Sequence, residues 1–232
     1  MLVHIAVDFF GQLAYDCYIE NCYNTGNINY KTNSSFVGGV CGNINIRSKA
    51  KKCYNTGNIG QDCSETSHTI GGVCGNLSDV GNLTQCFNTG NIMGYNRIGG
   101  IIGRANIDIK IENCYNTGNI EGIDKVGGLI GQSRKIQVIN NCYNSSIIKG
   151  DTNIGGVVGA LILEENESNP VNNTFSNEEN NRFFGFCSKN FTVDNKYIIS
   201  ANELKSATSK LGNNYKEDTQ NINNGYPILL WQ

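Results

Sequence analysis

The sequence has 232 residues, with 18 Lys and Arg against 20 Asp and Glu, and charged residues make up only 16% of the chain. This balance excludes a basic nucleic-acid-binding surface as the main function. A hydrophobic content of 39% supports a packed core, and apolar runs of only a few residues exclude a bilayer-spanning segment. The 28 Gly residues tolerate left-handed backbone conformations, so we expect a β-rich protein with many tight turns.

The N-terminal ten residues, MLVHIAVDFF, differ from a secretory signal peptide. They contain no Lys or Arg, and Asp8 interrupts the apolar stretch. We therefore expect either a protein that stays inside the cell or a piece of a larger polypeptide.

Two short motifs alternate along the chain. The segment CYNTGNI, or a close variant of it, begins at each of five cysteines: Cys22, Cys53, Cys86, Cys114 and Cys142. A glycine-pair motif, GGxxG, begins at each of five glycines: Gly38, Gly71, Gly99, Gly127 and Gly155. The first four glycine pairs each precede the next repeat cysteine by 15 residues, whereas the gap from cysteine to glycine pair varies from 13 to 18. The constant segment indicates a packed element, and the variable segment indicates a surface loop.

Each repeat unit has about 28 residues at its shortest and contains short apolar runs bounded by Gly and Asn, without helical periodicity. Such a unit cannot bury its own apolar face and must stack on its neighbours. The sequence therefore predicts an all-β fold, a parallel β-helix (β-solenoid) of roughly six coils, with a small C-terminal α/β cap. We assign residues 1–175 to the solenoid, with a degenerate first coil over 1–21, and residues 176–232 to a degenerate last coil and the cap.

Both ends of the repeat region show weakened copies of the motifs. Residues 7–11 align with GGxxG, and residues 172–175 (NNTF) align with the end of the constant segment. A capping box at Ser200 and Glu203 predicts a helix that ends near Gly212. The final residues, NNGYPILLWQ, are expected to plug the last coil with apolar side chains.

Stacked coils would place like residues in columns. The repeat cysteines, together with Cys41 and Cys74, are expected to be buried thiols, and no spacing among them fits a zinc site. Cys17, Cys63 and Cys187 lie outside these columns and are candidates for exposed or paired thiols. Asn side chains should stack by hydrogen bonds between amides, and the aromatic residues should stack along the solenoid wall. These columns are formed by Asn24, Asn55, Asn88, Asn116 and Asn144, and by Tyr23, Tyr54, Phe87, Tyr115 and Tyr143.

The GGxxG blocks, carried by Gly38, Gly39, Gly42 and their equivalents, alternate with CYNTGNI segments. This pattern resembles the GLUG-motif repeats of bacterial surface proteins. The resemblance implies a right-handed parallel β-helix, an extracellular or cell-surface location and a noncatalytic role. It supplies no catalytic residues.

The sequence leaves several functions open. The first hypothesis is a noncatalytic structural or adhesive module that displays loops 29–36 and 60–70 to a host or matrix protein or a glycan. Its candidate binding residues are Tyr30, Lys31, Asn33, Asp62, Glu65 and His68. The alternatives are a glycan-processing β-helix enzyme, which needs paired carboxylates from neighbouring coils, and sugar binding on the aromatic column, which needs exposed rings. We expect no cofactor, no metal, no nucleic-acid partner and no membrane insertion.

Overall fold

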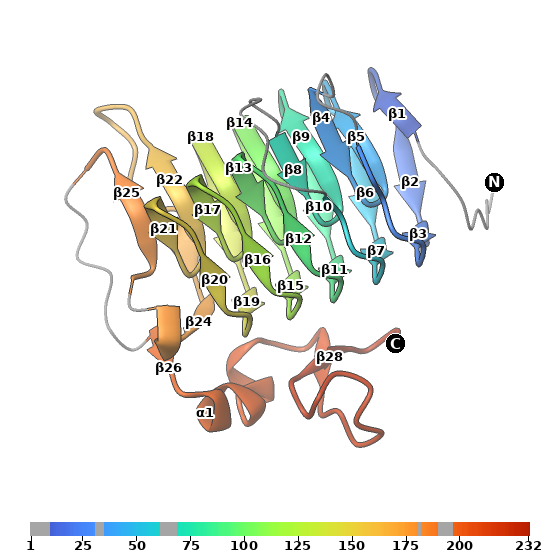
Figure 1. Cartoon of the computed structure of the whole chain (residues 1–232), viewed down its shortest axis with the longest axis vertical. Coiled ribbons are helices and arrows are strands. Elements are labelled where there is room, and N and C mark those ends of the chain that lie inside the picture. Colours follow the sequence, from blue (N-terminus) through green and yellow to red (C-terminus); the bar gives the residue numbers. More distant parts are fainter. Residues whose placement is uncertain (1–9, 31–34, 61–68, 181, 190–196) are drawn as a thin grey trace.

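A computed structural model describes residues 10–30, 35–60, 69–180, 182–189 and 197–232. The chain winds into stacked coils of parallel strands, and its C-terminal segment lies along one side of the stack (Figure 1). The predicted all-β solenoid of about six coils is confirmed. No helix in the described ranges is long and apolar enough to cross a membrane.

The largest sheet holds eleven strands, because it turns a corner and contains two segments of most coils. Its strands are β1 (Phe10–Leu13), β2 (Tyr18–Glu20), β5 (Cys41–Ile44), β6 (Lys49–Lys51), β9 (Cys74–Ser78), β10 (Asn82–Thr84), β14 (Ile102–Glu112), β18 (Ile130–Asn140), β22 (Val158–Ile162), β23 (Val171–Asn172) and β25 (Phe184–Cys187).

Three further parallel sheets complete the coils. The seven-stranded sheet contains β3 (Tyr23–Asn24), β7 (Tyr54–Asn55), β11 (Phe87–Asn88), β15 (Tyr115–Asn116), β19 (Tyr143–Asn144), β24 (Phe175–Asn177) and β26 (Ile198–Ile199). The three-stranded sheet contains β12 (Ile92–Met93), β16 (Ile120–Glu121) and β20 (Ile148–Lys149). The five-stranded sheet contains β4 (Phe36–Gly38), β8 (Thr69–Gly71), β13 (Asn96–Gly99), β17 (Asp124–Gly127) and β21 (Thr152–Gly155).

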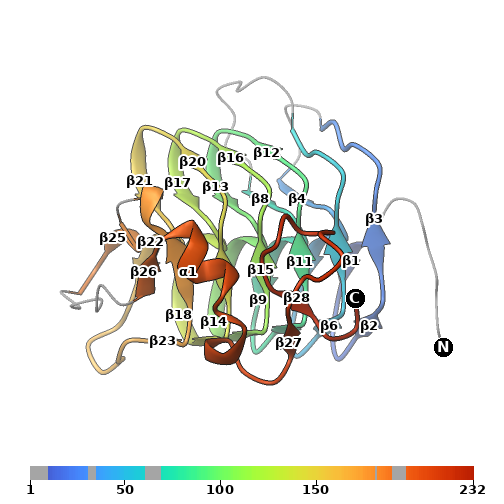
Figure 2. The ribbon, with the colours of Figure 1, turned by 90° about the horizontal axis from the view of Figure 1, so that it is seen from below.

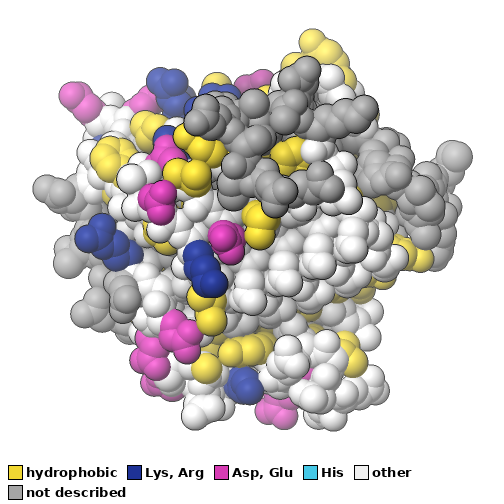
Figure 3. Space-filling view, viewed as in Figure 1, with side chains coloured by type: hydrophobic (Ala, Val, Ile, Leu, Met, Phe, Trp, Pro, Cys, Tyr) yellow, Lys and Arg dark blue, Asp and Glu magenta, His cyan; other side chains and the backbone are white. Residues whose placement is uncertain are grey.

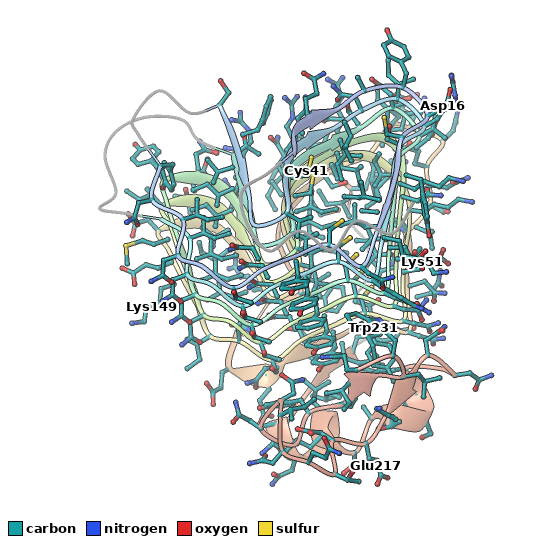
Figure 4. All side chains as sticks on the ribbon, turned by 90° about the vertical axis from the view of Figure 1, so that its right-hand side faces the viewer. Asp16, Cys41, Lys51, Lys149, Glu217 and Trp231 are labelled. Carbon is teal, nitrogen blue, oxygen red and sulfur yellow. The ribbon has the colours of Figure 1, made fainter. Side chains whose placement is uncertain are left out.

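The strand register follows the repeat residue for residue. Phe87 pairs with Tyr54 and Tyr115, and Ile98 pairs with Ile70 and Val126. The weakened copies also take their predicted places, because Phe10 pairs with Cys41 and Phe175 pairs with Tyr143. Apolar residues at the inward positions form the solenoid core, and Figure 4 shows Cys41 inside the coil while Lys51 and Lys149 point outward on opposite sides.

The constant 15-residue spacing has a physical cause in the interior. The second glycine of each of the first four pairs lies against the Asn side chain 16 residues later in the same coil, and Gly156 of the fifth pair lies against Ser176. A Cβ on Gly100 would lie 2.2 Å from the Gly128 carbonyl oxygen and 2.3 Å from the Asn116 side chain. A side chain cannot fit there, so the glycine pair and the Asn must keep their distance along the chain.

The turn before each repeat cysteine, and before Thr174 in the following coil, places its middle residue in the left-handed region. This residue is Asn in four coils, which tolerates the conformation, but it is Lys52 or Gln85 in two others. The φ angles lie between 40° and 57° at Asn21, Lys52, Gln85, Asn113, Asn141 and Asn173.

The helix predicted over residues 200–212 is shorter than expected. The capping box of Ser200 and Glu203 is present, and α1 spans Ala201–Lys205. Ser206 then ends the helix, and a 3-10 turn follows at Thr208–Lys210, because Ser and Thr hydroxyls compete with helical hydrogen bonding.

The expectation that the last residues plug the final coil is wrong. Only the start of the segment, around α1, packs beside β24 of a late coil. The rest, including the antiparallel pair β27 (Tyr215–Lys216) and β28 (Ile228–Leu229), runs back toward the earlier coils (Figure 2). Trp231 thereby reaches the rings of Tyr54 and Phe87, between the solenoid and the C-terminal segment (Figure 4). An outward aromatic column attracts this cover because its apolar edges would otherwise face water.

Candidate functional site: an axial groove

The most regular repeat residues stabilise the solenoid and are not exposed to a ligand. In the inner Asn column, each Nδ2 donates to Oδ1 of the Asn in the next coil at 2.7 to 2.9 Å. The same Nδ2 donates to the carbonyl oxygen two residues later in the chain, as from Asn88 to Gly90 at 2.8 Å. The predicted amide stack is confirmed, and its burial leaves it inaccessible to a ligand.

The cysteine columns form free thiols in the core, as predicted. Burial raises the pKa of Cys74, Cys86 and Cys114 well above the usual value, which removes the reactive thiolate near neutral pH. Cys17 and Cys187, outside the columns, are half-buried free thiols, and Cys63 lies outside the described residues. Within the described ranges, no group of His, Cys, Asp or Glu is arranged to hold a metal ion.

The aromatic column stacks face to face, with ring centroids 4.7 to 5.0 Å apart and planes within 7°. The C-terminal segment covers the later part of this column, where Tyr115 and Tyr143 are fully buried. The Tyr143 hydroxyl donates to the Pro227 carbonyl, and Tyr115 exchanges a hydrogen bond with Gln232. Sugar binding on the faces of these covered rings is therefore contradicted, while Tyr23 and Tyr54 are half-buried.

An open groove of about 440 Å³ lies on the three-stranded sheet instead. We call it the axial groove, because its walls are two columns that run across the coils. The first column is Asn58, Asn91, Asn119 and Ile147, and the second is Gly60, Met93, Glu121 and Lys149. The alternation of a strand turns the residues between them, Ile59, Ile92 and Ile120, into the core, where each is 1% exposed.

The first wall presents amide groups at coil spacing. Oδ1 of Asn58 accepts the backbone N–H of Asn91 at 3.0 Å, and Oδ1 of Asn91 accepts that of Asn119 at 3.0 Å. This bond fixes each side chain in place. Among the described residues, the Nδ2 groups of these two Asn have no protein acceptor, so they remain able to donate to a ligand.

The second wall varies in chemistry from coil to coil. Met93 is 36% exposed, and Glu121 and Lys149 follow it in register on β16 and β20. Figure 3 shows hydrophobic, acidic and basic side chains along this line over β12, β16 and β20, beside a broad uncharged surface over β11 and β15. The groove thus combines fixed polar donors, an apolar patch and one charge of each sign, which suits noncovalent binding of an extended ligand.

One of the sequence-predicted binding residues, Tyr30, contacts a wall residue of this groove without lining the groove itself. Tyr30 is half-buried, packs against the neighbouring core and donates its hydroxyl to the carbonyl of Met93 at 3.1 Å. Lys31, Asn33, Asp62, Glu65 and His68 lie outside the described residues. Tyr30 and Gly60, the described residues that directly precede these segments in the chain, lie beside the groove and in its lining, respectively.

Sequence reasoning missed the groove residues themselves. The column of Asn58, Asn91 and Asn119 had a signal, since the second Asn of the CYNTGNI segment recurs in four of the five units. Met93, Glu121 and Lys149 had none, because each is a different residue type at the same repeat position.

Basic residues near residue 50, among them Arg47 and Lys51, lie on the outside of the solenoid. Arg47 forms a bidentate ion pair with Asp16 of the preceding coil, and Lys51 lies 3.6 Å from Glu20. Exposed pairs of this kind contribute little to stability.

Comparison with known proteins gives one match. The GLUG motif matches residues 94–121, a segment that begins just before β13 and ends with β16. No curated protein and no solved structure matches the chain. The matched segment has the length of one coil and contains one GGxxG block and one CYNTGNI segment, both of which recur in the neighbouring coils. The chain is therefore a repeat protein built as a β-solenoid that carries a GLUG motif over residues 94–121, with the same two short motifs in its neighbouring coils.

Proposed function

We propose that this solenoid is a noncatalytic structural and adhesive module of a bacterial cell-surface or secreted protein, and that it binds an extended glycan or a host or matrix protein chain through the axial groove and its neighbouring loops. The observation that carries this proposal is the juxtaposition of the groove with the bases of both variable loops at Tyr30 and Gly60. The coils supply a stiff support, and the loops supply the variation that distinguishes ligands.

A glycan is the favoured ligand. Sugar hydroxyls accept and donate hydrogen bonds, and the outward amides of Asn58, Asn91 and Asn119 repeat at about the 4.8 Å spacing of stacked strands. The exposed apolar surface of Met93 and Ile147 can contact the C–H faces of sugar rings. Binding by such a groove uses many weak contacts and needs no reacting group.

The proposal is tested with the whole chain on a glycan array and on immobilised matrix proteins. The variant Asn91→Ala/Asn119→Ala removes two groove amides, and we expect it to weaken binding to the selected ligand at least tenfold. The matched control is Asn27→Ala, which alters the same outward column outside the groove and should leave affinity unchanged. Equal affinity of the groove variant and the wild type would contradict the groove as the binding site.

The contribution of the loops to ligand selectivity and the absence of catalysis are tested by separate measurements. Alanine substitution of Lys31, Asn33, Asp62, Glu65 and His68 should change which array members bind, while the groove variant should reduce all of them. Prolonged incubation with the selected ligand should leave it intact by mass spectrometry. Release of a cleaved product would favour a glycan-processing enzyme instead.

A further inference from the structure

A second groove, of about 460 Å³, lies on the eleven-stranded sheet, and we call it the arginine groove. It is formed where β9, β14 and β18 approach the corner of the solenoid. Its lining contains three basic side chains, Arg104, Arg134 and Lys135, together with polar Ser78 and Asn106. Asp79 and Glu164 also line it.

The register of the strands brings the arginines together. Arg104 of β14 pairs with Gln132 of β18, and Asn106 pairs with Arg134, so the two arginines lie on the same outward face at diagonal positions. Ala105 and Ser133, between them, are fully buried and turn inward. A third arginine, Arg97, precedes Arg104 in the same coil. Its Nε donates to Oε1 of Gln132 at 2.6 Å, and Gln132 is the strand partner of Arg104, so Arg97 lies close to the other two arginines.

None of these cations forms an ion pair in the described part of the chain. No carboxylate lies within 4 Å of Arg97, Arg104, Arg134 or Lys135, although Asp79 and Glu164 line the same groove. Partial burial lowers the pKa of Arg104, and the charges of Arg97 and Arg134 lower it further. The arginines therefore repel one another at neutral pH, unlike Arg47, which is paired with Asp16.

We propose that the arginine groove binds an oxyanion, a sulfate or phosphate group held between Arg104 and Arg134 and supported by Arg97. Guanidinium groups offer paired N–H donors that match the oxygens of such a group, and the bound charge relieves the repulsion among the three cations. Asn106 adds a further side-chain donor in the same lining. This site lies on a different sheet from the axial groove and does not depend on the function proposed for it.

The group can be a free ion or a substituent of a larger molecule, and the experiment distinguishes these sources. Titration calorimetry at low ionic strength measures binding of inorganic sulfate, inorganic phosphate and a heparin-derived hexasaccharide to the whole chain. Low salt is needed because screening weakens exposed charge contacts. Binding of the inorganic ions indicates a site for the oxyanion alone, and binding of the hexasaccharide only indicates a sulfated glycan.

Two variants with the same charge change test the location. Arg104→Gln/Arg134→Gln should weaken binding at least tenfold, and Lys49→Gln/Lys51→Gln, which removes two exposed cations from β6, should weaken it less than twofold. If the first variant misfolds, Arg134→Gln alone serves, because Arg134 is exposed and its loss leaves the core intact. The proposal is overturned if no probe binds, or if the two double variants weaken binding equally.

Discussion

Two asparagine columns, three residues apart in the same repeated TGN-containing segment, have opposite surroundings. Asn116 of the inner column is fully buried, and its Nδ2 donates to both Asn144 and Gly118. Asn119 of the outer column is exposed, and its Oδ1 accepts the backbone N–H of Ile147 at 3.3 Å. The same residue type therefore holds the coils together at one position and is available to a ligand at the other.

The comparison teaches that regular repetition does not by itself indicate a function. A column in the interior repeats because the neighbouring atoms leave no space for a different side chain, as the close contact between Gly100 and Asn116 demonstrates. An outward column is under no such constraint, and the chain either covers it, as with Tyr115 and Tyr143, or leaves it open, as in the axial groove. Stability measurements can separate these cases.

The largest difference is expected between Asn116→Ala and Asn119→Ala. Asn116→Ala removes four buried hydrogen bonds at roughly 1 kcal/mol each, so we expect the free energy of unfolding to fall by about 4 kcal/mol. Asn119→Ala leaves water to replace its partners and should cost less than about 1 kcal/mol. Urea unfolding followed by circular dichroism measures both. A similar cost for the two variants would contradict the assignment of separate roles to the columns.

The cover on the aromatic column can be weakened separately from the coils. Leu229 is fully buried against this column, and Leu229→Ala should destabilise the C-terminal segment by about 3 kcal/mol through lost burial and a cavity. Limited proteolysis should then cleave within residues 212–232 much faster than in the wild type. Leu230→Ala is the control, because Leu230 is 55% exposed and its loss should not change the cleavage rate. Equal cleavage of the two variants would contradict a close contact between segment and solenoid.

The coil architecture could be predicted because each coil repeats the same residues at the same spacing. Cys114, Asn116 and the glycine pair recur at constant spacing, and stacking of equal units is the arrangement that buries all of them. Alternation turns Tyr115 outward, because it lies between the inward Cys114 and Asn116, but no repeat spacing shows which segment covers it in that direction. The position of the C-terminal segment depended on that direction, which is why the predicted plug of the last coil failed.

The candidate sites were harder to predict than the fold. The two loops were found as variable segments, and Tyr30 does lie beside the axial groove. Arg97, Arg104 and Arg134 occupy three different repeat positions and come together only through strand register and side-chain reach. No spacing in the sequence indicates such a cluster. Sites made by unlike residues on neighbouring coils therefore require the structure.

The buried thiols give the smallest expected effect, seen as a pH dependence. Burial holds the pKa of Cys114 above that of a thiol in the unfolded chain, which is about 8.5. The folded state therefore keeps the proton while the unfolded state loses it. The contribution is fully present below about pH 8.5 and is lost as pH rises above that value, at about 1.4 kcal/mol per pH unit.

Between pH 8 and pH 10, Cys114 alone should lower the free energy of unfolding by about 2 kcal/mol. Cys114→Ala should be less stable than the wild type at pH 8 because of the smaller side chain, but its loss of stability toward pH 10 should be smaller by that amount. Val73→Ala is the control, because Val73 is fully buried but carries no ionisable group, so its substitution should lower stability equally at pH 8 and pH 10. If the wild type and Cys114→Ala lose stability in parallel with rising pH, the core does not hold the Cys114 thiol protonated. The inner columns would then be more open to solvent than the full burial of Cys114 indicates.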